Sequence, residues 1–340
     1  MQDQIIDLAL ELTKVTKAKI ADLDQIMLRT QILSMNARLE AARAGEAGKS
    51  FTIVAQEMGS VSQEVTALSA SLNAAITENA ARIQNAGNDM SITFRGSRYA
   101  DLARNAVEIM DRNLYERSCD VRWWATDSAV VDAVQSPGAD AAAHATSRLA
   151  TILRSYTVYL DLWIADRSGR VIANGRPERY RDVVGADVSR EDWFRRGLQT
   201  ADGDSFVVCD VETAPRLGGA QVATYATAIR AGGATRGEAA GVLGIFFDWE
   251  PQARAIVDGI SLSREERACS KVMLLDSRFR VIASNEPQAF GQPYALDPRD
   301  EWGHTVRNDK IVAYGLTPGY ETYRGLGWFG CIESPAHLAS

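Results

Sequence analysis

The segment Ala44-Gly45-Glu46-Ala47-Gly48-Lys49 lies between two helical stretches and decides the fold of the first part of the chain. Its two glycines permit a sharp reversal of the backbone. On both sides of this segment apolar residues step by three and four. The steps before it are Ile5, Leu8, Leu12 and Val15, then Leu23, Ile26, Thr30, Leu33 and Ala37; those after it are Val54, Met58, Val61, Val65, Leu68, Leu72 and Ala75. This heptad spacing predicts an antiparallel coiled-coil hairpin.

Reversal near Glu46 pairs two arms of about forty residues, each about 60 Å long at the helical rise of 1.5 Å per residue. Lys19 interrupts the apolar series of the first arm. The returning arm is expected to end near Gly87-Asn88, where the sequence carries a helix-breaking signal.

Composition divides the chain into two halves. All nine prolines lie at or after Pro137, and tryptophan and tyrosine are absent before Trp123 and Tyr99, respectively. Residues 1–136 are rich in Ala, Leu, Glu, Gln and Arg, which favour helix. The rest alternates β-branched and aromatic runs with Gly, Pro and Asp turns, as a mixed sheet and helix domain does. The sequence therefore predicts an α+β protein.

Charge and hydropathy exclude two classes of protein. A net charge of -7 argues against a nucleic-acid-binding protein, which needs a basic face. No apolar run approaches the roughly 18–20 residues of a membrane span, and the first residues do not form a signal peptide. We therefore expect a cytoplasmic protein with no membrane span.

Cysteine and histidine are too widely spaced for a familiar metal motif. The residues in question are Cys119, Cys209, Cys269, Cys331, His144, His304 and His337. No Cys-x-x-Cys pair occurs, which favours free thiols in a reducing compartment over a disulfide framework or a zinc site. We expect no metal and no cofactor.

Phe51 is the only aromatic residue among the first 93 and follows the predicted turn directly. A coiled-coil core does not require an aromatic residue there, whereas an exposed aromatic near a tip can anchor a partner. Two interpretations of the hairpin stay open: a binding tip, and a coiled coil that serves only dimerisation.

Residues 26–63 read IMLRTQILSMNARLEAARAGEAGKSFTIVAQEMGSVSQ. This segment resembles the hairpin tip of methyl-accepting chemotaxis proteins, whose usual form includes NAAIEAARAGE followed by G-x-x-F-x-V-V-A-x-E-V. Asn36, the run from Glu40 to Glu46, and Phe51 carry the resemblance. In that family two hairpins form a dimeric four-helix bundle, and dimers associate at their tips into trimers.

The resemblance implies two sets of contact residues at the tip. The trimer contact would use Leu28, Asn36, Glu40 and Arg43, while Ile32, Glu46, Phe51 and Ile53 would face the coupling protein and the histidine kinase. Glu40 and Arg43 also lie three residues apart, on one helix face, where they can form an ion pair. Arg29, Gln31, Arg38 and Ser50 depart from the usual residues of the family. Because the arms are short and lack methylation-type pairs, we expect no adaptation by methylation.

The second half of the chain contains a duplicated hairpin. Residues 162–174 align with residues 272–284, and each copy is an apolar strand, a tight turn led by aspartate, and a second Val-Ile-Ala strand. An offset of 110 residues indicates two related modules. Further strands are expected at 205–210, 220–229, 241–248, 311–316 and 327–333. Helices are expected at 190–198, at 251–260 and from about 99 to 133.

A long helix followed by two such modules resembles the double Cache sensor domain, a PAS-like antiparallel sheet architecture. The segments NLYERSCDVRWWATD, DLWIADRSGRVIANG, VSREDWFRRGLQ and GYETYRGLGWFGCIE carry this resemblance. It implies four parts: the truncated signalling hairpin (1–90), a long sensor helix (91–136), a first, ligand-binding Cache module (137–262) and a second, shortened Cache-like module (263–340).

The Cache resemblance also implies a ligand pocket in the first module. The residues assigned to it are Trp163, Arg190, Trp193, Phe194, Asp210, Tyr225 and Asp248. Aromatic rings with a carboxylate suit an amine or amino acid, through cation–π attraction and charge-assisted hydrogen bonds. Glu191 stands where amino-acid sensors carry arginine, so other small polar metabolites stay open. Core packing of the aromatics and helix capping by Asp248 are the alternatives.

These observations predict a non-enzymatic receptor that senses a small molecule and modulates a chemotaxis-type histidine kinase. One alternative is a ligand-binding regulator whose hairpin serves only dimerisation. Another is an enzyme that uses Asp166, Asp210 and Asp248 as general acids or bases. No nucleophile elbow, phosphate loop or metal-ligand spacing supports the enzyme.

Overall fold

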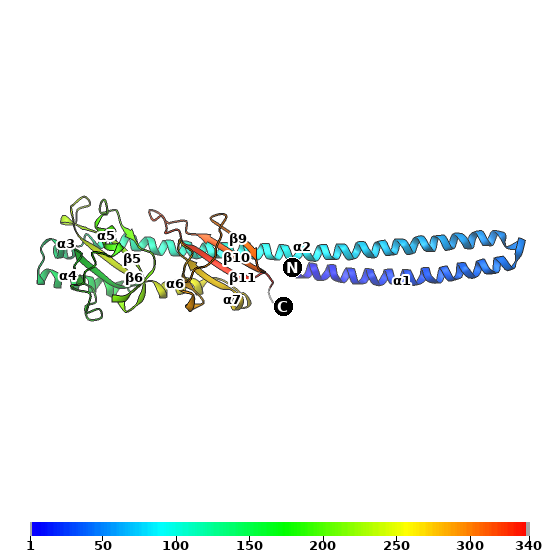
Figure 1. Ribbon diagram of the computed structural model, residues 1–340, viewed down its shortest axis with the longest axis horizontal. Coiled ribbons are helices and arrows are strands. Elements are labelled where there is room, and N and C mark those ends of the chain that lie inside the picture. Colours follow the sequence, from blue (N-terminus) through cyan, green and yellow to red (C-terminus); the bar gives the residue numbers. More distant parts are fainter. Residues whose placement is uncertain (1, 338–340) are drawn as a thin grey trace. The chain divides into compact units, whose positions relative to one another are not determined.

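The computed structural model describes residues 2–337, and the chain falls into two compact units that meet between Arg95 and Gly96. The first unit is a helical hairpin made of α1 (Gln2–Arg43) and the first part of α2 (Lys49–Trp124) (Figure 1). A short 3-10 turn, η1 (Gly45–Gly48), joins the two helices. The backbone reverses at Gly45, whose φ of 60° lies in the left-handed region that favours glycine. The predicted antiparallel hairpin is confirmed.

Small residues line the inside of the hairpin. Most of the buried positions are spaced by seven residues: Ser34 and Ala41 on α1, Gly48 in η1, and Ala55, Ser62 and Ser69 on α2; Ile20 lies fourteen residues before Ser34. The Ser34 hydroxyl donates to the carbonyl oxygen of Ala55 (2.5 Å), and the Ser62 hydroxyl donates to that of Met27 (2.8 Å). A Cβ atom on Gly48 would lie 2.1 Å from the Ala41 carbonyl oxygen, so the helices meet too closely there for any side chain.

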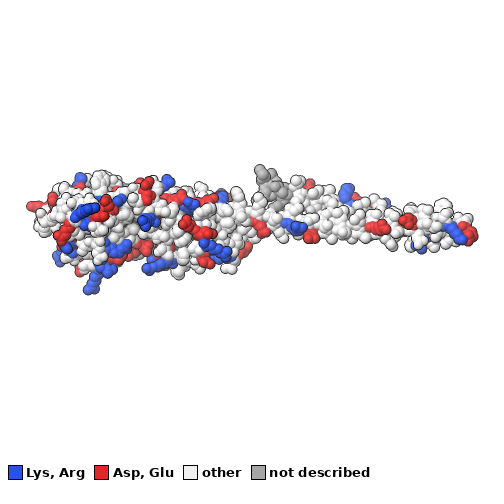
Figure 2. All heavy atoms as spheres, turned by 90° about the horizontal axis from the view of Figure 1, so that it is seen from above, with Lys and Arg blue, Asp and Glu red and all other residues white. Residues whose placement is uncertain are grey.

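The larger apolar residues of the predicted heptads face outwards from this single hairpin. Exposed members are Leu8, Leu12, Val15, Leu23, Ile26 and Leu33 on α1, and Val54, Val61, Leu68 and Leu72 on α2. We call these residues the outer stripe. Figure 2 shows that much of the hairpin surface visible there carries no charged side chain. The hairpin therefore has an inner seam of small residues and an outer stripe of large ones.

Two predicted helix boundaries are wrong. Helix α2 continues through Gly87-Asn88 because one glycine costs only about 1 kcal/mol relative to alanine inside a helix. It then ends at Trp124 instead of continuing to residue 133. The Asp127 carboxylate accepts the Ala129 N–H (3.0 Å) and caps a separate helix, α3 (Ser128–Gln135). The long sensor helix expected at 91–136 is thus the last part of α2, which begins at Lys49 and ends at Trp124.

The second unit begins with an antiparallel sheet in the order β2-β1-β6-β5-β3, with β4 also paired to β5. Its strands are β1 (Tyr159–Asp166), β2 (Val171–Asn174), β3 (Val207–Val208), β4 (Glu212–Ala214), β5 (Ala220–Arg230) and β6 (Ala239–Asp248). Helix α4 (Ala139–Ser155) packs on β1 and β2, and α5 (Asp192–Leu198) packs on β5 and β6. The sequence did not predict α4, and the strand expected at 205–210 is reduced to β3.

A second antiparallel sheet follows in the order β8-β7-β11-β10-β9. Its strands are β7 (Lys271–Leu275), β8 (Val281–Ser284), β9 (Trp302–Arg307), β10 (Lys310–Leu316) and β11 (Phe329–Pro335). Helices α6 (Trp249–Gly259) and α7 (Arg264–Cys269) connect the two sheets along the chain. Single turns of 3-10 helix occur at η2 (Pro215–Leu217), η3 (Ala231–Gly233) and η4 (Pro287–Ala289). Strand β9 and helix α7 were not predicted.

The duplicated hairpin is confirmed in detail. β1 pairs with β2 and β7 with β8, and both pairs shift register at the equivalent place, after Ile164 and after Leu274. Asp166 accepts backbone N–H groups two and four residues further on, and Asp276 does the same. The aspartate that leads each turn therefore holds the turn closed.

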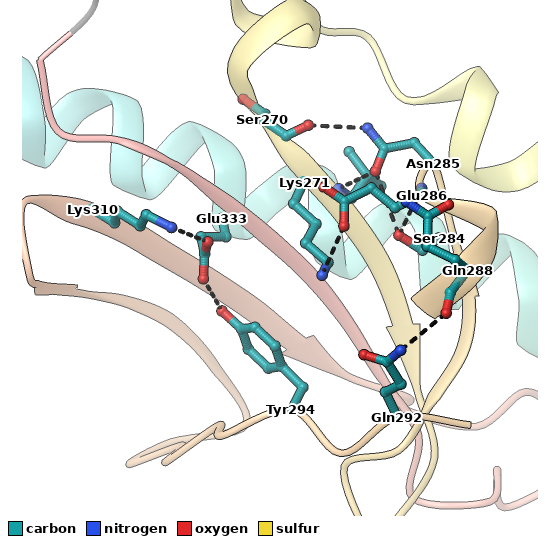
Figure 3. A network of polar contacts seen from close by, with 11 residues as sticks. Ser270, Lys271, Ser284, Asn285, Glu286, Gln288, Gln292, Tyr294, Lys310 and Glu333 are labelled. Atoms are coloured by element: carbon teal, nitrogen blue, oxygen red, sulfur yellow. Dashed lines mark hydrogen bonds and ion pairs between the residues drawn. The ribbon is translucent and has the colours of Figure 1, made fainter. Parts of the chain in front are cut away.

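Polar contacts join the inner strands of the second sheet at one end of these strands (Figure 3). The Glu333 carboxylate accepts from the Lys310 ammonium (2.6 Å) and from the Tyr294 hydroxyl (2.7 Å), while Lys271 pairs with Glu286 (3.0 Å). Each ammonium group in this network lies beside a carboxylate. The charges of the two lysines are thus balanced by the two glutamates, and these contacts stabilise the sheet.

Replacement of Gly48 by alanine tests the close approach of the two hairpin helices. The added methyl group collides with the backbone of Ala41, so we expect Gly48→Ala to destabilise the tip by about 1–3 kcal/mol. Hydrogen exchange of residues 41–55 measures this, and exchange in that segment should accelerate. Gly138→Ala is the control, because no atom lies within 4 Å of the corresponding Cβ position and its φ of -176° is extended. Unchanged exchange in Gly48→Ala would contradict the proposed packing.

Candidate functional site

The hairpin tip exposes every residue of the two predicted contact sets. Phe51 is 71% exposed, Ile53 69% and Ile32 48%. Glu46 is exposed and pairs with Lys49 (2.6 Å). Three of the four side chains that are predicted to face the kinase are thus apolar groups in contact with water. The role of this set stays a prediction.

The trimer set is exposed as well. Leu28 is exposed on α1, as is Asn36. Arg43 donates to the Glu40 carboxylate at 2.6 Å, which confirms the ion pair expected from their spacing. Both side chains are more than two-thirds exposed, so the pair adds little to stability by itself. Its groups remain accessible to a neighbouring copy.

In the second unit, three of the predicted ligand residues form one aromatic cluster. The Trp163 ring lies 4.1 Å from Phe246 and 6.3 Å from Trp193, and Phe194 lies 6.0 Å from Trp193, measured between ring centroids. All four side chains are buried in one apolar core beneath α5. The rings pack on one another, as the core-packing alternative requires.

A buried carboxylate that the sequence analysis missed orients this cluster. Asp161 is fully buried and accepts the Trp163 indole N–H (3.0 Å), the Asn174 amide (2.8 Å), and the backbone N–H groups of Leu162 (2.9 Å) and Gly175 (3.0 Å). Burial raises the pKa of the Asp161 carboxyl, although these donors act to lower it. In the sequence, the position of Asp161 two residues before Trp163, on the same face of the strand, was the feature that could have revealed this contact.

Asp248 lies at the N-cap position of α6, yet its side chain makes no capping hydrogen bond there. Burial raises the pKa of its carboxyl, while the Arg179 and Arg176 guanidinium groups act in the opposite direction. The carboxylate is half-buried, so part of it faces solvent. The Asp248 carboxylate is therefore not used in a hydrogen bond that caps the helix. Arg190 is exposed on the surface.

Near this carboxylate the Tyr180 hydroxyl is buried without a hydrogen-bond partner among the described residues. Burial raises its pKa, and the negative charges of Asp161 and Asp248 act in the same direction. A buried hydroxyl of this kind can accept or donate to a small polar ligand.

Asp210 and Tyr225 lie in a different place. Side chains alternate along β5, so Tyr225 points away from the face on which Val222 and Ala226 join the aromatic cluster. The Phe206 ring stacks 6.4 Å from the fully buried Tyr225 ring, and the Asp210 carboxylate accepts the Trp328 indole N–H (3.0 Å). The seven predicted ligand residues therefore do not line a single pocket.

Asp111 on α2 is a second buried carboxylate that the sequence did not reveal. One of its oxygens accepts the Gly319 N–H (2.7 Å), and the other is buried without a hydrogen-bond partner among the described residues. Burial raises the pKa of Asp111 to about 6, although the Gly319 hydrogen bond acts to lower it. The partial negative charge of this unpartnered oxygen faces the protein interior.

The three carboxylates of the enzyme alternative do not form a catalytic pair. The Asp166 carboxylate accepts hydrogen bonds within its own turn. The Asp166 backbone pairs with Gly241 near the start of β6, whereas Asp248 lies at the end of that strand. Seven residues of strand separate these two ends, which corresponds to about 23 Å. Asp210 is engaged by Trp328.

Comparison with known proteins supports both halves of the prediction. Residues 3–152 match the methyl-accepting chemotaxis protein (MCP) signalling domain. The chain is 39% identical over 90 residues to the frizzy aggregation protein FrzCD of Myxococcus xanthus, covering 25% of this chain and 22% of that protein. It is 50% identical over 44 residues to the chemoreceptor McpA of Caulobacter vibrioides, covering 13% of this chain and 7% of that protein. The matched segments thus span less than a quarter of these relatives.

The solved structures resemble the chain in fold. The sensory domain of the Campylobacter jejuni chemoreceptor Tlp3 has a TM-score of 0.50 and 14% identity, covering 73% of this chain and 98% of that one. A domain of a sensory box/GGDEF family protein from Vibrio parahaemolyticus has a TM-score of 0.50 and 11% identity, covering 72% and 97%. The predicted likeness to a chemoreceptor sensor is confirmed as a likeness of fold. Within residues 2–337, no helix combines the length and apolar character needed to cross a bilayer.

Asp111 makes the stability of the protein depend on pH. Because its pKa of about 6 lies above the value of about 3.9 in an unfolded chain, the folded state binds the proton more tightly. Its contribution to stability is therefore present below pH 4 and is lost as the pH rises through about 6. We expect Asp111→Asn to raise Tm relative to the wild type at pH 8, with a smaller gain at pH 5. Calorimetry at both pH values measures this, and an equal change at both would contradict the assignment.

Proposed function

We propose that this protein is a chemoreceptor-like signal transducer. In this proposal the second unit senses a small molecule, and the hairpin tip modulates a chemotaxis-type histidine kinase together with its coupling protein. The observation that carries the proposal is the exposed apolar group of Ile32, Phe51 and Ile53 beside a turn that matches the MCP signalling domain. Exposed aromatic and aliphatic side chains of this kind are typical anchors of protein interfaces.

Helix α2 offers a physical route between the two functions. The same helix carries Phe51 in the first unit and, in the second, fully buried residues such as Tyr99 and Met110. Its contacts in the second unit are polar as well as apolar: the Tyr159 hydroxyl on β1 donates to Asp120 (2.5 Å), and the N–H of Gly319, in the loop between β10 and β11, donates to Asp111 (2.7 Å). A ligand can act only if it binds two states of this helix with different affinity.

The proposed ligand is an amine, an amino acid or another small polar metabolite. Asp248 is the best-placed carboxylate for an ammonium group, because no cap bond uses it and the unpartnered Tyr180 hydroxyl lies near it. Trp163, Trp193 and Phe194 would form the apolar side of such a site. Roles for Arg190, Asp210 and Tyr225 have less support, because Arg190 is exposed on the surface and the other two residues lie in a different place.

The outer stripe implies a homodimer. The ten large aliphatic side chains of the outer stripe are exposed in the single chain, while the inner seam already satisfies the contact between α1 and α2. Burying apolar surface stabilises association by roughly 25 cal/mol per Å². A second hairpin packed on this stripe would complete a four-helix bundle, and trimers of such dimers would use Leu28, Asn36, Glu40 and Arg43.

Truncation of Phe51 tests the signalling role. We expect Phe51→Ala to weaken co-purification with the chemotaxis histidine kinase and coupling protein by about tenfold or more, as loss of an interface anchor does. Phe94→Ala is a matched control, because Phe94 lies on the same helix, is 68% exposed and is remote in sequence from the turn. Equal binding by the two variants would favour the alternative in which the hairpin serves only dimerisation.

A charge in the outer stripe tests dimerisation. We expect the wild type to sediment as a dimer and Leu68→Asp to shift the equilibrium to monomer, because a carboxylate would have to be desolvated in the interface. Asn73→Asp adds the same charge outside the stripe and should leave the dimer intact. Analytical ultracentrifugation distinguishes these outcomes. A monomeric wild type would refute this part of the proposal.

A further inference from the structure

We propose that the second unit contains a separate binding site for a small carboxylate at the C-terminal end of α2. A cavity of about 330 Å³ lies there between the last turns of α2, the end of β5 and the segment around η3. Ligand sites for small molecules typically occupy about 300–1,000 Å³. Two arginines, Arg122 and Arg230, line this cavity.

This cavity is distinct from the predicted ligand pocket. Thr227 lines it and lies two residues after Tyr225 on β5, so both side chains point to the same face of the sheet. Val222 and Ala226 join the cluster of Trp163 and Trp193 on the other face. Because the neighbouring residue Ala228 also lines the cavity, the cavity lies around the end of β5 and is not confined to one face. At this end of β5 Arg230 pairs with Ala239, whereas Val222 pairs with Asp248 at the other end, so the two sites lie at opposite ends of these strands.

Arg230 supplies a buried positive charge without an anionic partner. Its side chain is only 8% exposed, and it donates to the carbonyl oxygens of Gly237 (2.8 Å) and Thr200. Its Nε atom is buried and has no hydrogen-bond partner within the described residues, and no carboxylate among them pairs with it. The pKa of Asp202 is lowered chiefly by a hydrogen bond from Ser205, and the positive charge of Arg230 also contributes. Arg230 and Asp202 form no ion pair. A buried cation in this situation favours a bound anion.

Arg122 brings a second guanidinium to the same cavity. It is half-buried on α2 and donates to the carbonyl oxygens of Ser118 (2.9 Å) and Asp204 (3.4 Å) and to the Cys119 sulfur (3.4 Å). All three acceptors are neutral atoms. Because a guanidinium carries five N–H donors, both arginines keep donors for a ligand.

The lining defines the charge and the shape of the ligand. Against the two arginines it includes one acidic residue, Asp204, so a single negative charge on the ligand balances the site. A carboxylate matches the planar donor geometry of guanidinium groups. Ala125, Ala228 and Ala234 supply apolar surface for a short hydrocarbon body. The ligand class is therefore a small monocarboxylic acid.

Occupancy of this site would act directly on α2, because Arg122 and Cys119 belong to that helix. A carboxylate held between Arg122 and Arg230 would link the end of α2 to the end of β5. The protein would then have a second chemical input besides the predicted pocket near Asp248.

Thermal denaturation of the full chain with sodium acetate, propionate, pyruvate and benzoate tests the site, with sodium chloride at equal ionic strength as the reference. We expect at least one of these acids to raise Tm in a saturable way. Titration calorimetry should show that Arg122→Gln weakens its binding by about tenfold or more, as loss of a charged hydrogen-bonding partner does. Arg264→Gln, an exposed arginine on α7, and Asp248→Asn should bind as the wild type does.

Cysteine labelling gives a readout on the unmodified protein. Cys119 lines the cavity and is partly accessible, whereas Cys269 is exposed on α7. We expect the bound acid to slow alkylation of Cys119 by iodoacetamide and to leave that of Cys269 unchanged.

Three results would overturn the proposal. One is that no acid of the panel raises Tm above the chloride reference. Another is that Arg122→Gln binds as tightly as the wild type, or that Cys119 is not protected. The third is that Asp248→Asn abolishes the effect, which would assign the acid to the site near Asp248.

Discussion

The unbroken hydrogen-bonded backbone of α2 is the constraint on which both units depend. From Lys49 onwards it forms the returning arm of the hairpin, and up to Trp124 it provides buried side chains to the second unit. A helix in a folded protein gains its stability mainly from the packing of its faces against other elements. In the first unit that packing comes from α1, and in the second it comes from the two sheets, through residues such as Asp111 and Asp120.

Residue size decides how the hairpin uses its two faces. Close contact between α1 and α2 requires side chains as small as Ala41, Gly48 and Ser34, whose hydroxyl bonds directly to the opposite backbone. Near the turn, large aliphatic residues cannot enter such a narrow seam, so they lie outside it. Ile20, a large residue that is buried, lies further along α1, away from the turn. One helix pair therefore presents a satisfied inner face and an apolar outer face, which is the arrangement expected of a subunit of a larger bundle.

Buried polar groups give the second unit its specific sites. Asp161 orients Trp163 through four donors, so this carboxylate belongs to the structure of the aromatic core. Arg230 and Asp111, by contrast, each bury a polar atom that has no partner among the described residues. Such atoms carry a cost in free energy. At Arg230 a bound ligand, and at Asp111 a bound proton, can therefore change the relative stability of two conformations of the protein.

The sequence by itself determined the hairpin, its turn at Gly45, and the duplicated strand pairs led by Asp166 and Asp276, because these features follow from local spacing and turn chemistry. It could not determine that α2 continues through Gly87, since the cost of one glycine, about 1 kcal/mol, is too small to stop a helix. Nor could it show that Tyr225 and Trp193 lie on opposite faces of one sheet. The face of the sheet that α5 covers and the cavity around Arg230 depend on contacts between residues far apart in the chain, and only the tertiary structure sets those contacts.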